Sequence, residues 1–282
     1  MQVFEHQYPR YCPLKMKDSI GLIAGGGDLP LFFARAAKSK GLSLHVVAVR
    51  GSASKKIEKL SDSIQWVSLG QVGALIGFFK KKGVRQAVMH GKVQHSELFK
   101  HFKLDLKALS LWLRLKDRSG EGLLGALSQE LKKQGVLLKD CRFLMEEVLT
   151  PKNFNVGKVD FDSKATIAFG LKKAKNLAEL GIGQTLIVKK NAVVAVEAME
   201  GTDKTIQRAG VFAGSGTIVV KVSSPGQDWR FDVPTIGMET FQKLIQIKAK
   251  GIVLESGKSF LLEKEQLSSL AKKNGLFIHT VS

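Results

Sequence analysis

The chain has 282 residues, 44% of them apolar, and a formal net charge of +19, so it is long enough for two compact domains and favours an anionic partner. Cys12 and Cys141 are the only cysteines and lack metal-ligand spacing, which excludes a disulfide framework and a zinc site. No apolar run approaches the roughly 20 residues of a membrane-spanning helix. Residues 1–18 are interpreted as a loose extension without a secretory signal.

The first half of the chain alternates strand and helix patterns. An apolar strand at 19–24 leads into Gly25, Gly26, Gly27 and Asp28, and a helix with Pro30 in its first turn follows to about Lys38. Further elements are expected as strands at 43–49, within 60–69 and at 86–90, and as a helix at 72–82. This alternation predicts an α/β fold with a Rossmann-like, parallel-sheet N-terminal domain over 19–150.

The glycine turn is a candidate phosphate-binding element. Successive glycines let the backbone approach a ligand, and a helix start offers free N–H groups to a phosphate. The dinucleotide fingerprint is not met, because Pro30 stands at the third glycine position and no acidic residue follows the strand that ends at Val49. NAD binding is therefore rejected, and a simple tight turn is the alternative.

Residues 97–116 have the spacing of an amphipathic helix. Its apolar positions recur at helical intervals among several lysines: Leu98, Phe102, Leu106, Leu109 and Leu113. Such a helix could lie on acidic lipid, or it could pack these side chains on the core and turn a basic face outward.

The remaining pattern indicates a second domain. A helix at 123–134 and a strand near 142–146 precede the proline- and glycine-containing linker 151–158. The C-terminal α/β catalytic domain, 159–282, is expected to form a cleft with the first domain. Its predicted elements are a helix at 163–180, a hairpin of 184–188 and 192–198 with a Lys190–Asn191 turn, strands at 216–222, 251–254 and 259–262, and helices at 239–249 and 266–273.

Asp232 lies in the stretch WRFDVPTIG, between Phe231 and Val233, and is expected inside an apolar strand. A buried carboxylate is costly, so Asp232 should either pair with Arg230 or Lys221 or line a cleft. The neighbouring donors suit phosphoryl chemistry, in which basic groups neutralise developing charge while a carboxylate binds a cation or positions water. These donors and their acidic neighbour are Lys221, Gln227, Asp228 and Arg230.

A second acidic group follows the strand at 192–198 and comprises Glu197, Glu200 and Asp203. Strand ends followed by glycine turns are common places for sites in α/β proteins. Asp203 alone is interpreted as the N-cap of a helix from Lys204. The histidines at 90, 95 and 101 accompany no G-x-S-x-G, Walker A or D-x-H motif, which disfavours those enzyme classes.

The segments GLIAGGGDLP, HGKV, IGQ, AVEAMEGTD and RFDVPTIG together resemble the LpxI-type UDP-2,3-diacylglucosamine pyrophosphatases of bacterial lipid A synthesis. The resemblance extends from Ile20 onward. It implies Mg²⁺-dependent hydrolysis of the substrate's diphosphate to UMP and lipid X, and peripheral association with the cytoplasmic face of the inner membrane. It implies no nucleic-acid partner and leaves a homodimer open.

By motif, the family's essential aspartate corresponds to Asp232, with Glu200 as a second expected metal ligand. The residues expected to bind substrate are Gly25, Gly26, Gly27, Asp28, Thr202, Asp203, Lys221, Gln227, Arg230 and Thr235. One segment departs from the family's Gly-Asp-Asp-x-Leu-Leu-Arg run: residues 119–125 read SGEGLLG, with one acid in place of two and no arginine. Glu121 or Asp117 is expected to take over part of that role.

Two other functions are consistent with the residues alone. A non-catalytic nucleotide or nucleic-acid binding protein would need the glycine turn and the positive charge without any special role for Asp232, and its affinity would depend strongly on salt. A membrane-surface scaffold would use the helix at 97–116.

Overall fold

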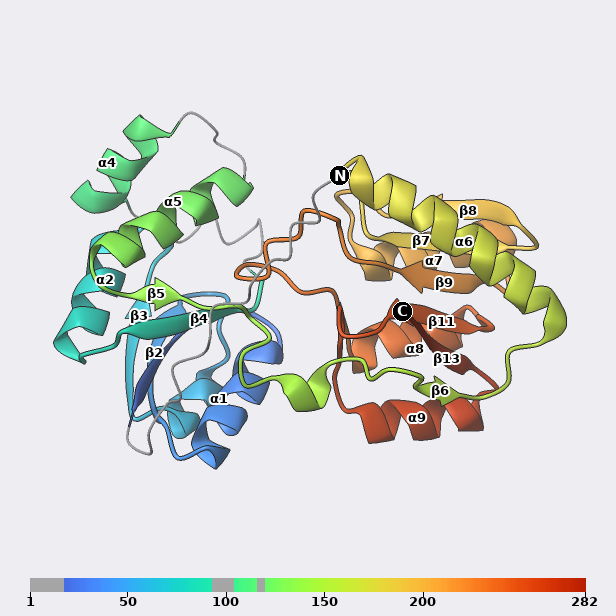
Figure 1. Ribbon diagram of the computed structural model, residues 1–282, viewed down its shortest axis with the longest axis horizontal. Coiled ribbons are helices and arrows are strands. Elements are labelled where there is room, and N and C mark those ends of the chain that lie inside the picture. The colour runs from blue at the N-terminus through green and yellow to red at the C-terminus, as the bar shows by residue number, and fades with distance from the viewer. Residues whose placement is uncertain (1–17, 93–103, 116–119) are drawn as a thin grey trace, which may run out of the picture. The chain divides into compact units, whose positions relative to one another are not determined.

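The computed structural model describes residues 18–92, 104–115 and 120–282, and the chain divides into two compact units, Met1–Lys139 and Asp140–Ser282 (Figure 1). The first unit contains a parallel sheet in the order β3-β2-β1-β4-β5. Its elements are β1 (Ser19–Ala24), α1 (Leu29–Ser39), β2 (Ser43–Val49), η1 (Lys55–Leu60), β3 (Ser63–Val67), α2 (Val72–Lys81), β4 (Gln86–His90), α4 (Leu106–Arg114), α5 (Gly120–Lys133) and β5 (Leu137–Leu138).

The second unit contains a mixed sheet in the order β6-β13-β11-β9-β7-β8, in which β9, β11 and β13 run parallel. A two-stranded pair, β10 with β12, accompanies this sheet. The elements are η2 (Glu146–Val148), β6 (Asn155–Val156), α6 (Phe161–Glu179), β7 (Thr185–Lys189), β8 (Ala192–Val196), α7 (Thr202–Ala213), β9 (Ile218–Lys221), β10 (Thr235–Ile236), α8 (Met238–Gln246), β11 (Gly251–Glu255), β12 (Phe260–Leu261), α9 (Lys264–Lys273) and β13 (Phe277–Val281).

The β7–β8 hairpin forms where the sequence predicts it. Lys190 and Asn191 have φ values of 46° and 58°, the left-handed pair that a two-residue hairpin turn requires. The two strands then pair antiparallel, and β7 also pairs antiparallel with β9. The first residue of β7 therefore meets the last residue of β9 at one edge of the sheet.

Besides the strand expected around Asp232, which is described with the site below, two predictions of local structure are wrong. Arg142–Glu146 forms turns that lead into η2, because Cys141 is tied to the main chain of Trp229 instead of joining a ladder. Asp203 is not an N-cap, since α7 begins one residue earlier and Gly201 is its cap, with φ of 82°. None of the helices in the described part of the chain is long and apolar enough to cross a membrane.

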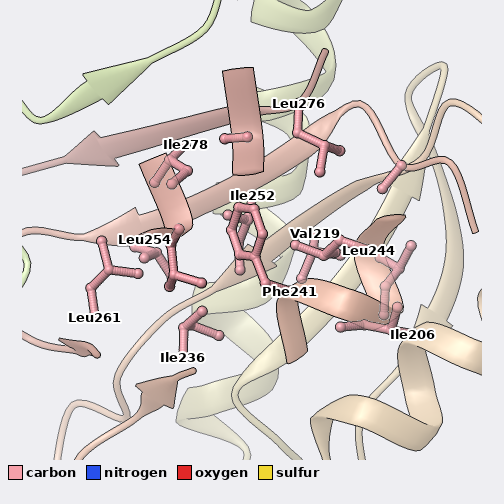
Figure 2. Close-up of a cluster of buried hydrophobic side chains, with 14 of the residues drawn as sticks. Ile206, Val219, Ile236, Phe241, Leu244, Ile252, Leu254, Leu261, Leu276 and Ile278 are labelled. Carbon is pink, nitrogen blue, oxygen red and sulfur yellow. The ribbon is translucent and has the colours of Figure 1, made fainter. Parts of the chain in front are cut away.

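The mixed sheet has an apolar core on each face. Helices α7, α8 and α9 cover one face, and Figure 2 shows Phe241 and Leu244 of α8 packed against Ile252 of β11 and Val219 of β9. Helix α6 covers the other face through Ile167, Ala174 and Ala178. A sheet buried on both sides leaves the strand ends as the places where polar side chains can gather.

Gly170 of α6 lies at a close approach of this helix to the sheet. A Cβ at this position would lie 2.9 Å from a methyl carbon of Val220 and 3.1 Å from one of Val188. Valine side chains have little rotational freedom, so the contact could be relieved only by moving the helix.

Gly170→Ala is therefore expected to lower the free energy of unfolding by about 1–3 kcal/mol, because the added methyl overpacks the interface. The matched control is Gly77→Ala in α2, an exposed helical glycine with open space around it, which should raise stability by about 0.5–1 kcal/mol. Denaturant titration followed by circular dichroism measures both. An unchanged or higher unfolding midpoint for Gly170→Ala would contradict this packing.

Candidate active site

Polar residues from four strands meet at one edge of the mixed sheet, by which we mean the edge formed by strand ends and not an outer strand. Glu197 follows β8, Lys221 ends β9 and Glu255 ends β11, while Thr185 begins the antiparallel strand β7. Sites in α/β sheets commonly lie outside the carboxyl ends of the parallel strands. This edge is the candidate active site of the C-terminal unit.

Lys221 is the centre of this edge, and only 5% of its surface is exposed. Its Nζ donates to Thr202 Oγ1 at 2.8 Å and to Thr185 Oγ1 at 3.0 Å. Glu197 Oε2 lies 3.7 Å away, and Glu197 Oε1 accepts a hydrogen bond of 2.8 Å from the Thr202 hydroxyl. Removing an ammonium from water costs several kcal/mol, which these oxygens offset.

Helix α7 begins at Thr202, directly at this cluster. The first turn of a helix carries free N–H groups and the positive end of the helix dipole. The Lys221 ammonium, which Glu197 partly neutralises, therefore lies beside the positive end of a helix dipole. Such an arrangement favours a phosphate group.

Glu255 organises the neighbouring strand end and is almost fully buried, with 2% of its surface exposed. Its Oε2 accepts from Ser223 N at 2.7 Å and from Ser223 Oγ at 2.9 Å, and its Oε1 lies 3.3 Å from Lys258 Nζ and 3.7 Å from Lys175 Nζ. Burial alone would raise the pKa of Glu255, but the hydrogen bonds from Ser223 and the charge of Lys258 lower it below the ordinary value of 4.5. Glu255 thus fixes the start of the loop that follows β9.

Gln227 fixes the middle of the same loop. Its Oε1 accepts from Gln184 Nε2 at 2.9 Å and from Ser224 N at 3.3 Å, and its Nε2 donates to the main-chain oxygen of Asp232 at 3.1 Å. The side-chain amide, which the sequence suggests as a substrate contact, is engaged within the protein. Because Gln184 directly precedes β7, these bonds connect the main chain of Asp232 to the strand ends.

Asp232 does not lie in a strand, as its apolar neighbours suggest. It is exposed in the loop between the turn at Asp228–Phe231 and β10. The expected pairing with Arg230 or Lys221 is also absent from the described residues. Arg230 instead forms a two-pronged ion pair with Asp228 at 2.6 Å and lowers the pKa of that carboxyl group. The Asp232 carboxylate has no ion pair or hydrogen bond within the described part of the chain.

The segment around Asp232 is held on its other side by residues that follow the N-terminal unit. Cys141 N donates to Trp229 O at 2.7 Å, and Cys141 Sγ donates to Arg230 O at 3.2 Å. Burial raises the pKa of the Cys141 thiol well above its usual range, so the thiol stays protonated and can donate. The guanidinium of Arg142 stacks 4.2 Å from the ring centre of Trp229.

The remaining acidic and hydroxyl residues of the sequence prediction are engaged locally. Glu200 pairs with Arg208, and hydrogen bonds from its own backbone and from Arg208 lower its pKa to about 2. Asp203 Oδ1 accepts from Thr240 Oγ1 at 2.6 Å, which joins α7 to α8. Thr235 Oγ1 donates to Val233 O at 2.8 Å.

The glycine turn of the N-terminal unit is packed against the end of β4. Gly25 N donates to His90 O at 2.8 Å, and Gly26 N donates to Lys92 O at 2.7 Å. A Cβ at Gly91 would lie 2.5 Å from Gly26 O, so the two turns require glycine to approach each other. Asp28 occupies the N-cap position of α1 without a capping hydrogen bond from its side chain.

Sequence reasoning missed Glu255, Gln184 and Thr185 as parts of this edge. The run GIVLE did carry a signal, because it is an apolar strand that ends in a glutamate. The carboxyl ends of neighbouring parallel strands lie together, which places this carboxylate among them. The expected replacements for the altered family segment are not placed. Asp117 lies outside the described residues, and the side chain of Glu121 does too.

The role of Glu255 predicts a pH-dependent stability. Because its pKa is lowered in the folded state, its contribution is present above the ordinary carboxyl pKa of 4.5 and is lost as the pH falls through the lowered value. Glu255→Gln should cost about 1–3 kcal/mol at neutral pH, since the lysines lose their counter-charge, and less at acidic pH.

Denaturant titrations of both proteins across pH 7 to about 3 measure this difference. The exposed Glu147→Gln is the control and should change stability by less than about 0.5 kcal/mol. A difference between wild type and Glu255→Gln that does not change with pH would contradict an ionised Glu255 in the folded protein.

Comparisons with known proteins cover both units. The family description "LpxI N-terminal domain" matches residues 19–148, and "LpxI C-terminal domain" matches residues 153–279. A curated relative from Caulobacter vibrioides, named UDP-2,3-diacylglucosamine pyrophosphatase LpxI, is 28% identical over 272 residues, which are 92% of this chain and 96% of the relative.

Solved structures with some similarity include N5-carboxyaminoimidazole synthetase from Staphylococcus aureus, at 15% identity and a TM-score of 0.27 over 66% of this chain and 42% of that one. The ADP complex of the purK synthetase has 14% identity and a TM-score of 0.29 over 70% of this chain and 45% of that one. These scores are too low to support an argument about this protein. The matches to both LpxI domains and the similarity along almost all of the Caulobacter relative establish that the chain belongs to the LpxI family.

Proposed function

We propose that this protein hydrolyses the diphosphate of UDP-2,3-diacylglucosamine to UMP and 2,3-diacylglucosamine 1-phosphate, lipid X, in lipid A biosynthesis. The observation that carries the proposal is the similarity over 92% of the chain to a relative named for that pyrophosphatase activity. The comparisons give no support to the alternative of a non-catalytic nucleotide or nucleic-acid binding protein.

The reaction adds water to one phosphorus atom and breaks the bond from that atom to the bridging oxygen. Negative charge develops on the departing phosphate, so groups that hold positive charge in place lower the barrier. Lys221 and the N-terminal turn of α7 are the groups that would supply this charge. Thr202 would donate its hydroxyl to the same oxygens once its proton leaves Glu197.

Asp232 is the carboxylate available to act on water. It is exposed, and Gln227 ties its main chain to the sheet edge that carries Lys221. Its carboxylate would orient the attacking water or accept its proton. Arg230 is paired with Asp228 and would have to leave that carboxylate to bind substrate.

The carboxylates present are consistent with Mg²⁺. The described residues contain no cluster of three metal-binding side chains, and Mg²⁺ typically binds through one or two carboxylates together with substrate phosphates. Asp232 would hold the ion, with Glu200 as a second ligand only if it leaves Arg208. When bound, the ion would neutralise charge on the diphosphate.

For the N-terminal unit we propose a Rossmann-like fold, which the strand order β3-β2-β1-β4-β5 and the parallel pairing support. The turn from Gly25 to Asp28 would contact a phosphate through Gly27 and the first turn of α1, since Gly25 and Gly26 already donate to the end of β4. Peripheral binding to the cytoplasmic face of the inner membrane is proposed because the substrate is a lipid and the net charge is +19.

Release of UMP from UDP-2,3-diacylglucosamine tests the activity. Purified protein with Mg²⁺ should release UMP, and EDTA should stop the release until Mg²⁺ is restored. Asp232→Asn should reduce turnover by about 10²–10⁴-fold, the range that one acid–base group contributes. Stability should stay within about 0.5 kcal/mol, because the side chain is exposed.

The exposed Asp162→Asn in α6 is the control for loss of a surface charge, and its turnover should equal that of wild type. A folded wild-type protein that releases no UMP would refute the proposed activity. Turnover of Asp232→Asn close to wild type would leave the activity in place and remove Asp232 from the mechanism.

A further inference from the structure

Helix α4 carries leucines on its outer face. Leu106 is 87% exposed, Leu113 70% and Leu109 42%, and Leu104 just before the helix is 45% exposed. Positions 106, 109 and 113 follow the i, i+3, i+7 spacing of one helix face. The expectation that these leucines pack on the core with a basic face outward is therefore wrong for all three. Leu98 and Phe102 lie outside the described residues.

The opposite face of α4 holds the helix in place. Ala108 is buried, and Leu111, Trp112 and Leu115 are partly buried. Asp105 caps two helices at once, since its Oδ1 accepts from Ala108 N at 2.8 Å and its Oδ2 accepts from Gly73 N of α2 at 2.7 Å. Packing and capping on one side fix the orientation of the leucines on the other.

Basic residues border these leucines. Arg114 is exposed at the C-terminal end of α4, and Lys107 forms an ion pair of 2.7 Å with Glu130 of α5. Helices α2, α4 and α5 lie together on the side of the parallel sheet opposite α1 (Figure 1). Within these three helices six basic residues stand against two acidic ones: Lys80, Lys81, Lys107, Arg114, Lys132 and Lys133 against Glu121 and Glu130.

We propose that the leucine face of α4, formed by Leu104, Leu106, Leu109 and Leu113, docks on the surface of an anionic lipid bilayer. A helix with aligned leucines and flanking cations is suited to lie in the plane of a membrane with its apolar face in the boundary between headgroups and acyl chains. The positive border complements anionic headgroups. The choice of a bilayer over a protein partner rests on the proposed function, because a diacylated substrate resides in a membrane.

The other large exposed apolar residues do not form such a row. Phe161 and Leu180 are highly exposed but stand at opposite ends of α6, Met199 lies in the loop before α7, and Val211 and Phe212 are adjacent at the end of α7. Leu180, 73% exposed after α6, therefore offers a matched control for the loss of one exposed leucine.

Co-sedimentation of the full-length protein with vesicles tests the proposal. Wild type should bind vesicles that contain phosphatidylglycerol more tightly than pure phosphatidylcholine vesicles, and less tightly as salt rises. Leu106→Gln with Leu113→Gln should weaken binding at least about 10-fold, whereas Leu180→Gln should not. Thermal unfolding should be unchanged in both variants, since the replaced side chains are exposed.

Three results would overturn the docking surface: no vesicle binding by wild type, equal binding by the double variant, or an equal loss in Leu180→Gln. Activity on detergent-dispersed substrate separates bilayer binding from binding of the substrate's acyl chains. A raised KM of the double variant on that substrate, with vesicle binding retained, would assign the leucines to substrate and overturn the proposal. Vesicle binding without UMP release would refute the proposed activity and support the docking surface.

Discussion

The candidate site depends on how one buried ammonium group is compensated. Lys221 ends β9 with 5% of its surface exposed, and its charge is balanced by the hydroxyls of Thr185 and Thr202 and by Glu197. These partners come from β7, from α7 and from the segment after β8. The antiparallel insertion of β7 and β8 beside the parallel strands is what brings them together. The fold therefore buries a positive charge together with the oxygens that compensate it, at the ends of these strands.

The loop after β9 runs from the buried Lys221 to the exposed Asp232. Glu255 binds Ser223 near the start of this loop, Gln227 connects its middle to Asp232, and Cys141 holds the main chain near Arg230. Asp232 is exposed in this loop and, unlike the exposed Asp228, is not paired with Arg230. Its main chain is held in place, and its carboxylate could meet a metal ion or water without first breaking an ion pair to another described residue.

Local signals predicted much of the secondary structure. The Lys190–Asn191 turn and the strand, glycine turn and helix at residues 19–39 follow from backbone preferences of a few neighbouring residues, and they were predicted correctly. Asp232 shows where this reasoning fails. Its apolar neighbours resemble a strand, but Asp228 forms a local turn by accepting from Arg230 N and pairing with the Arg230 guanidinium. The bonds from Cys141 that hold this turn come from a distant part of the chain and are not encoded locally.

The sequence named several of the side chains that the structure brings together, but their roles stay predictions. Lys221 and Thr202 are in contact at the strand ends, whereas Gln227, which was assigned to substrate, has its amide engaged within the loop. Glu255 was missed, because its importance comes from the pairing of β11 with β9. The outward leucines of α4 show the same limit, since periodicity identifies an apolar face without saying what covers it.

A crystal structure with UMP and diacylglucosamine 1-phosphate bound would test the central claim most directly. The account predicts product phosphate oxygens within hydrogen-bond distance of the Thr202 hydroxyl and the Lys221 ammonium, with the Asp232 carboxylate turned towards the same phosphate. Product phosphates bound away from the carboxyl ends of β8 and β9, with Asp232 facing only solvent, would contradict it.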